Sequence, residues 1–130
     1  MNDNKMMETL CEYLDGSGVG VFMPEVWRDG AFAIFLTGKT EICKQYVNGD
    51  RVVAVEFEIR SRCPGESADD RLVVLKNYSS LADYVKKTPF PEAEVEVLMT
   101  KGAQKAKVYK GGSEEYVSTC KLIYLKRTQI

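Results

Sequence analysis

Two pairs of glutamates have the spacing in this sequence that best suits catalysis. Glu56 and Glu58 alternate along one apparent strand and Glu94 and Glu96 along another, so each pair would lie on one strand face about 7 Å apart. Paired acids can hydrolyse a bond when an apolar pocket separates their pKa values. Alternation on a solvated face produces the same pairs, so we expect surface carboxylates and keep a hydrolase as the third interpretation.

The sequence contains no histidine, which excludes His-based catalytic triads and His-containing zinc sites. The four cysteines, Cys11, Cys43, Cys63 and Cys120, are too far apart for a CxxC redox pair or a zinc knuckle. A chain of 130 residues that is 45% apolar does not need disulfides to fold. We therefore expect reduced thiols of an intracellular protein, with no metal and no cofactor.

Alternating glycines at Gly16, Gly18 and Gly20 follow an apparent helix. A nucleotide-binding loop needs its glycines between a strand and the start of a helix, which is the reverse order. The glycines therefore predict a flexible connection from helix to strand. Because no other motif supplies catalytic groups, we expect the protein not to be an enzyme.

Charge is unevenly distributed along the chain, although 18 basic and 19 acidic residues leave a net charge of only −1. Residues 101–130 hold seven cationic side chains and two glutamates, a local net charge of +5, which leaves −6 for residues 1–100. The basic side chains that we take as candidates for binding are Lys101, Lys105, Lys107 and Lys110.

Three interpretations of this basic segment stay open. It could lie beside acidic strands of its own sheet, since opposite charges commonly pair across strands. It could contact an acidic surface of a second copy, for which Glu56 and Glu58 are the candidates. It could also bind single-stranded nucleic acid by phosphate contacts and by base stacking on the interleaved tyrosines Tyr109, Tyr116 and Tyr124.

The elements that must position these residues begin with a short amphipathic helix. Its apolar face has helical spacing, and Asp15 and Gly16 end it; the face consists of Met7, Leu10, Cys11 and Leu14. A turn at Trp27–Gly30 then leads to an apolar run, Ala31–Leu36, which predicts a buried strand.

Asn48 and Gly49 predict a tight hairpin turn in which both residues adopt positive φ. The preceding strand is expected over Glu41–Val47. The following strand alternates strictly and ends at Cys63, Pro64 and Gly65; its inward residues are Val53, Val55, Phe57 and Ile59.

A longer central helix is predicted from an N-cap at Ser67 to Lys86 and Lys87, whose charges complement the helix dipole. Thr88–Pro91 prevents its continuation. Its buried stripe is expected to comprise Leu72, Leu75, Tyr78, Ala82 and Val85.

Three further strands are expected at Ala93–Thr100, Gln104–Lys110 and Glu115–Lys126. Residues 1–130 thus form a single α+β domain, with a mostly antiparallel sheet covered on one face by the N-terminal and central helices. The start of the chain lacks the pattern of a signal peptide, and no apolar run approaches the ~20 residues that span a bilayer, so we expect a soluble cytoplasmic protein.

Four segments together resemble the tail terminator or minor capsid proteins of long-tailed bacteriophages and prophages. They lie within residues 41–126: Lys44–Gly49, Val55–Arg60, Asp70–Tyr84 and Thr119–Tyr124. The resemblance implies a structural virion protein without an active site. Such a protein forms a ring, usually of six copies, that caps the tail tube and joins it to the head connector.

The resemblance implies three partners: further copies of the chain, the tail tube protein and a head-completion protein. It also implies a place in the phage neck, and in the host cytoplasm before assembly. Opposite charges on two patches would favour head-to-tail contact, so the candidate subunit interface comprises Glu56, Glu58, Lys101, Lys105, Lys107 and Lys110. The alternative function from another class is the single-stranded nucleic-acid-binding module.

Overall fold

The structure, a computed structural model, describes residues 3–24, 31–63, 68–92 and 94–127. The elements follow one another in the order α1 (Asp3–Asp15), β1 (Phe22–Pro24), β2 (Phe32–Gln45), β3 (Arg51–Cys63), α2 (Ala68–Lys87), β4 (Val95–Val108) and β5 (Glu114–Lys126). This confirms the α+β fold class.

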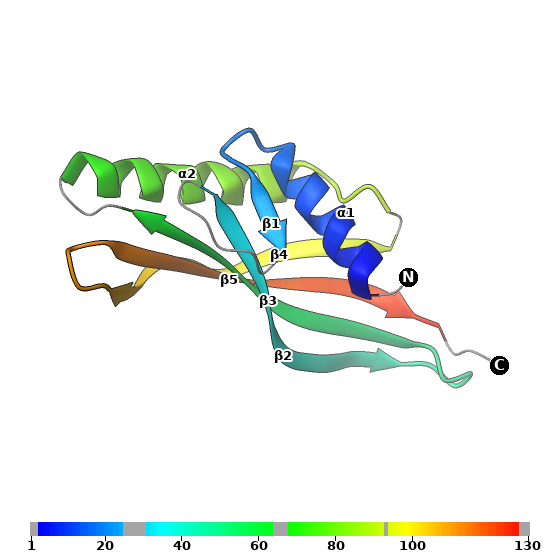
Figure 1. Ribbon diagram of the computed structural model, residues 1–130. Coiled ribbons are helices and arrows are strands. Elements are labelled where there is room, and N and C mark those ends of the chain that lie inside the picture. The colour runs from blue at the N-terminus through cyan, green and yellow to red at the C-terminus, as the bar shows by residue number, and fades with distance from the viewer. Residues whose placement is uncertain (1–2, 25–30, 64–67, 93, 128–130) are drawn as a thin grey trace.

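All five strands belong to one sheet in the order β1-β2-β3-β5-β4. The short β1 runs parallel to β2, and the other three pairs are antiparallel. Both helices lie over one face of the sheet and leave the opposite face open (Figure 1). We call these the helix face and the open face.

The N-terminal helix α1 ends at Asp15, as the sequence predicts. Its apolar side chains enter the core, where Leu10 and Leu14 are fully buried. The Asp15 carboxylate accepts a hydrogen bond of 2.7 Å from the backbone N–H of Phe22, which fixes the helix end to the start of β1. The glycine-rich segment between them is the predicted connection, and Gly18 adopts a φ of 77° there.

The hairpin between β2 and β3 forms where Asn48 and Gly49 predict it. The turn is closed by hydrogen bonds from Tyr46 N–H to the Asp50 carbonyl and from Gly49 N–H to the Tyr46 carbonyl. Only Gly49 has a positive φ, of 93°, so the prediction of two positive values is wrong. Asn48 instead accepts a hydrogen bond from the backbone N–H of Asp50 with its side-chain oxygen, which forms an Asx turn.

Strand β2 joins two predicted strands, Ala31–Leu36 and Glu41–Val47, into one. A register shift separates Leu36 from Thr40 in the pairing with β3, and Gly38 adopts a φ of 86° within it. A bulge of this kind bends a strand without ending it. Figure 1 shows the resulting sharp bend of β2.

Strand β4 likewise replaces two predicted strands, Ala93–Thr100 and Gln104–Lys110. Three register shifts between Met99 and Lys107 interrupt its pairing with β5, yet the strand continues. The prediction that Glu94 and Glu96 share a strand face is also wrong. Glu94 precedes β4 with a φ of 65°, and its carboxylate lies 3.5 Å from Arg127.

The central helix α2 ends at Lys87, as predicted, but two of the five residues of its predicted buried stripe are exposed. Leu72 is 61% exposed and Leu75 is 42% exposed, whereas Tyr78 and Leu81 are buried. Four predicted features lie outside the described residues, namely the turn at Trp27–Gly30, Pro64, Gly65 and the N-cap Ser67.

The core lies between the helices and the sheet. Phe57 and Ile59 of β3 are fully buried in it, and Phe32 packs edge-on against both Phe22 and Tyr78. Full burial of an apolar side chain of this size stabilises a fold by about 1.5–3 kcal/mol. The alternation along β3 therefore directs Phe57 and Ile59 into the core, as predicted.

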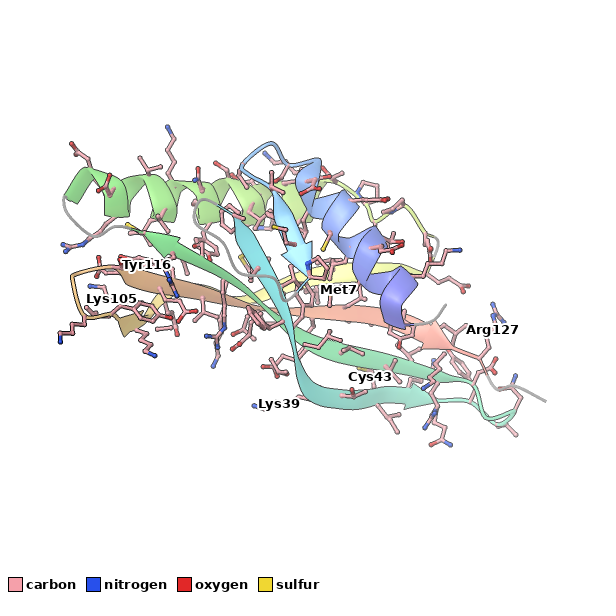
Figure 2. The ribbon with its side chains drawn as sticks, in the orientation of Figure 1. Met7, Lys39, Cys43, Lys105, Tyr116 and Arg127 are labelled. Carbon is pink, nitrogen blue, oxygen red and sulfur yellow. The ribbon has the colours of Figure 1, made fainter. Side chains whose placement is uncertain are left out.

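The four cysteines are free, and three of them are buried. Burial raises the pKa of Cys11 to about 11 and that of Cys120 to about 12. Both groups are therefore thiols rather than thiolates near neutral pH. The exposed cysteine is Cys43, on β2 (Figure 2).

Candidate subunit interface

The four candidate lysines do not share one face of the sheet. Lys101 and Lys107 pair with Thr119 and Glu115 of β5, whose side chains belong to the open face. Lys105 pairs with a residue of the helix face, because the register shifts in β4 change the alternation between them. Lys110 lies in the turn after β4.

Lys105 forms an ion pair within its own chain. Its ammonium lies 2.5 Å from the carboxylate of Glu114, which also accepts a hydrogen bond of 2.6 Å from Arg71 of α2. The Glu114 side chain is only 3% exposed. Hydrogen bonds from Lys105 and then from Arg71 hold the pKa of Glu114 below its usual range. This contact connects the start of α2 to β4 and β5.

The candidate glutamates lie together on the open face, as their spacing predicts, but in different surroundings. Glu58 binds the Arg60 guanidinium at 2.8 Å, and Arg60 also reaches Glu115 at 3.3 Å. Hydrogen bonding to Glu58 is the main reason why the pKa of Arg60 rises above its ordinary value. Glu56 is half-buried and stands opposite Lys121 of β5.

The three tyrosines of the basic segment do not form a common stacking surface. Tyr116 is buried on the helix face of the sheet, where it pairs with Lys105 of the neighbouring strand β4 (Figure 2). The Tyr109 ring has the guanidinium of Arg62 at 4.3 Å and the ammonium of Lys107 at 4.7 Å, and its hydroxyl donates to Glu115. Burial thus removes Tyr116 from any surface on which bases could stack, whereas Tyr109 is only half-buried.

A second anchor of α2 is the buried hydroxyl of Tyr78. It lies 2.9 Å from the hydroxyl of Ser61 and 3.2 Å from the carbonyl oxygens of Ile59 and Tyr116. Burial raises the pKa of Tyr78 above its ordinary value. The sequence identified Tyr78 as apolar core and did not indicate these polar contacts, because their partners lie 17 or more positions away.

Among the described residues, large apolar side chains are exposed at two opposite ends of the folded molecule. The hairpin end carries Ile42, at 52% exposed, and the fully exposed Val47. The start of α2 lies at the other end and carries Leu72, Val73 and Leu75 (Figure 1). The sequence suggests only that such residues are apolar, since an exposed and a buried leucine look the same there.

An apolar groove of about 430 Å³ runs between α1 and the sheet near the hairpin end. Met6, Met7 and Leu10 of α1 line one side, and Figure 2 shows Met7 between this helix and the strands. The opposite side is formed by residues of β2, β3 and β5, among them Leu36, Ile42, Val53, Val55, Leu122 and Tyr124. No local pattern in the sequence predicts this groove.

Among the described residues, the charged side chains that line this groove are Arg51 and Lys126, and both are cationic. Elsewhere in the residues that the structure describes, no three Cys, Asp or Glu side chains gather in a way that could hold a metal ion. Over the same residues, neither helix has the length and apolar character needed to cross a bilayer.

In comparisons with known proteins, no family model matches the chain and no curated protein matches it.

Proposed function

We propose that the chain is a structural subunit that assembles with copies of itself into a ring of the tail-terminator kind. The observation that carries this proposal is the exposure of large apolar side chains at both ends of the molecule, including Ile42 and Val47 at one end and Leu72 and Val73 at the other. Exposed apolar surface of this kind is a common sign of a surface that a partner covers.

A ring needs two different patches on each subunit, because each copy contacts one neighbour through one patch and the next through the other. Two apolar surfaces at opposite ends meet this requirement. In the proposed assembly the ring closes the tail tube and joins it to the head connector, so the partners are the tail tube protein and a head-completion protein. The free subunit is in the host cytoplasm, and the assembled ring is in the phage neck. The protein performs no chemical reaction.

The candidate charges contribute to this interface unequally. Lys105 and Glu58 bind Glu114 and Arg60 within the chain, so their charges are largely compensated there. Lys101 and Lys110 are exposed at the β4 side of the molecule, and Glu56 is accessible on the open face. We assign these side chains to the polar rim, where charges set register and association rate more than affinity.

Electron microscopy of the purified chain mixed with tail tubes tests the proposal. We expect rings at tube ends and tubes that stop growing when the chain is added. Tubes that elongate unchanged, with no density at their ends, would contradict it. Retention on single-stranded DNA that falls steeply with salt, in a protein that ignores tubes, would instead favour the nucleic-acid-binding alternative.

A further inference from the structure

We infer that the first turns of α2 from one copy dock in the groove beside α1 of the next copy. This inference rests on the proposed ring and names the two surfaces that form it. We call Leu72, Val73 and Leu75 the α2 ridge, and the cavity beneath α1 the α1 groove.

The α2 ridge consists of large apolar side chains that are exposed at the start of the helix. Leu72, Val73 and Leu75 are 61%, 58% and 42% exposed, although a helix normally turns its apolar residues to the core. Leu72 and Leu75 lie three positions apart and therefore on neighbouring positions of the helix surface. An exposed apolar helix face of this spacing is suited to binding in an apolar groove.

The α1 groove has the size and lining to receive such side chains. Its volume of about 430 Å³ lies within the range of protein binding clefts. Ile42 and Leu36 on its β2 side are 52% and 43% exposed, so water now contacts apolar surface that a neighbour would cover. Methionines Met6 and Met7 on the α1 side adapt readily to the shape of a partner.

The charges beside the two surfaces are complementary. The first turn of α2 carries Asp69 and Asp70, and Arg71, which separates them from the ridge, is paired with Glu114. The charged residues that line the groove are Arg51 and Lys126, which face each other across the β3–β5 pair. Opposite charges around an apolar contact favour one register and speed association.

The ridge is held rigidly in place by the ion pair of Arg71 with Glu114 and by the buried hydroxyl of Tyr78. A rigid surface loses little conformational freedom on binding. The start of α2, which carries the ridge, and the β2–β3 hairpin, near which the groove lies, are at opposite ends of the molecule (Figure 1). Because they differ, their contact is head-to-tail, and repeated contacts of this kind close into a ring or continue as a filament.

Sedimentation velocity of the full chain, up to millimolar concentration, tests this contact with three double variants. The ridge variant is Leu72→Asp with Val73→Asp, and the groove variant is Leu36→Asp with Ile42→Asp. The matched control, Val21→Asp with Val108→Asp, changes two valines that are 50% and 60% exposed outside both surfaces. Circular dichroism and thermal unfolding verify that each variant folds.

We expect the wild type and the control to associate alike, and the ridge and groove variants to associate at least about 10-fold more weakly. An equimolar mixture of the two weakened variants should form a dimer and nothing larger. The intact groove of one variant accepts the intact ridge of the other, and no second contact remains.

Two results would overturn this inference alone: ridge and groove variants that associate like the wild type, or a mixture of the two that stays monomeric. In either case the ring would use another contact. A wild-type chain that remains monomeric throughout the concentration range would contradict both this contact and the ring.

Discussion

The two halves of α2 are parts of one continuous helix, yet they face different surroundings. In the second half, Tyr78 and Leu81 are buried against the sheet. In the first half, Leu72 and Val73 are exposed, Val74 packs at the edge of the core, and Arg71 forms an ion pair with Glu114 of β5. Large apolar residues therefore continue along α2 into its first half, where they are exposed to solvent and not buried in the core.

This difference shows how a helix can be stable in one chain and still offer apolar surface to another. Polar contacts hold the first half of α2 in place without covering Leu72 and Val73. In the proposed ring a neighbouring copy covers them. The comparison predicts that the second half of α2 governs the stability of the monomer, and that the first half governs its assembly.

The largest effect on stability is expected for Leu81→Ala in the buried half. Leu81 is 0% exposed, so truncation removes its packing and leaves a cavity. We expect a loss of about 2–5 kcal/mol in the free energy of unfolding, measured by urea denaturation. Leu75→Ala, at a 42% exposed position in the first half of the same helix, is the matched control. If both variants lost the same free energy of unfolding, the two halves of α2 would not differ in their contribution to stability.

Tyr78→Phe should have the next largest effect. The change keeps the ring but removes the hydroxyl that contacts Ser61 and the carbonyl of Ile59. Leaving the buried Ser61 hydroxyl without this partner is expected to lower the free energy of unfolding by about 1–3 kcal/mol. Tyr46→Phe, at an exposed tyrosine, serves as the control in the same denaturation series. No difference between the two variants would show that the hydroxyl does not anchor α2.

Acid should loosen the first half of α2 through Glu114. Its pKa is lower in the folded chain than in the unfolded chain, so the unfolded state binds more protons as pH falls. The stabilisation from Glu114 is therefore complete above the ordinary glutamate pKa and is lost as pH falls through the lowered value. We expect Glu114→Gln to be less stable than wild type at neutral pH and to lose less stability on acidification.

Thermal unfolding between neutral pH and pH 3 measures this dependence. Glu96→Gln, at an exposed position of β4, is the matched control and should follow the wild-type curve. A Glu114→Gln variant with the wild-type acid profile would show that Glu114 does not hold the helix by its charge.

The smallest effect on stability is expected for Leu72→Ala combined with Val73→Ala. Both side chains are more than half exposed, so the free energy of unfolding should change by no more than about 0.5 kcal/mol per substitution. A loss of several kcal/mol in urea denaturation would mean that these residues already pack within the monomer, which would remove the contrast between the two halves.

Local signals in the sequence predicted much of the fold. The hairpin at Gly49, the end of α2 at Lys87 and the alternation of Phe57 and Ile59 depend on nearby residues, and the structure contains all of them. The predicted breaks near Gly38 and between Thr100 and Gln104 are instead bulges within continuous strands. Pairing with a neighbouring strand maintains a strand through a bulge, and the sequence of one strand does not reveal that pairing.

The candidate interface was less accessible to sequence reasoning. Helical spacing indicates that Leu72 and Tyr78 are apolar positions of α2, but not how far the sheet extends beneath the helix. The partner of Lys105 is Glu114, which lies across the turn between β4 and β5, so the sequence left that lysine as a candidate contact for a second copy. The α1 groove combines four elements and therefore has no local signature.

Chemical cross-linking can detect directly whether the α2 ridge of one copy lies in the α1 groove of the next. In a Cys43→Ser background, which removes the exposed native thiol, a chain with Leu72→Cys and Ile42→Cys is treated with a short bismaleimide. We expect a ladder of covalently joined copies on a denaturing gel, and no ladder from either single cysteine alone. No linked copies from the double variant, or the same ladder from a single variant, would contradict the docking of α2 in the groove of a neighbouring copy.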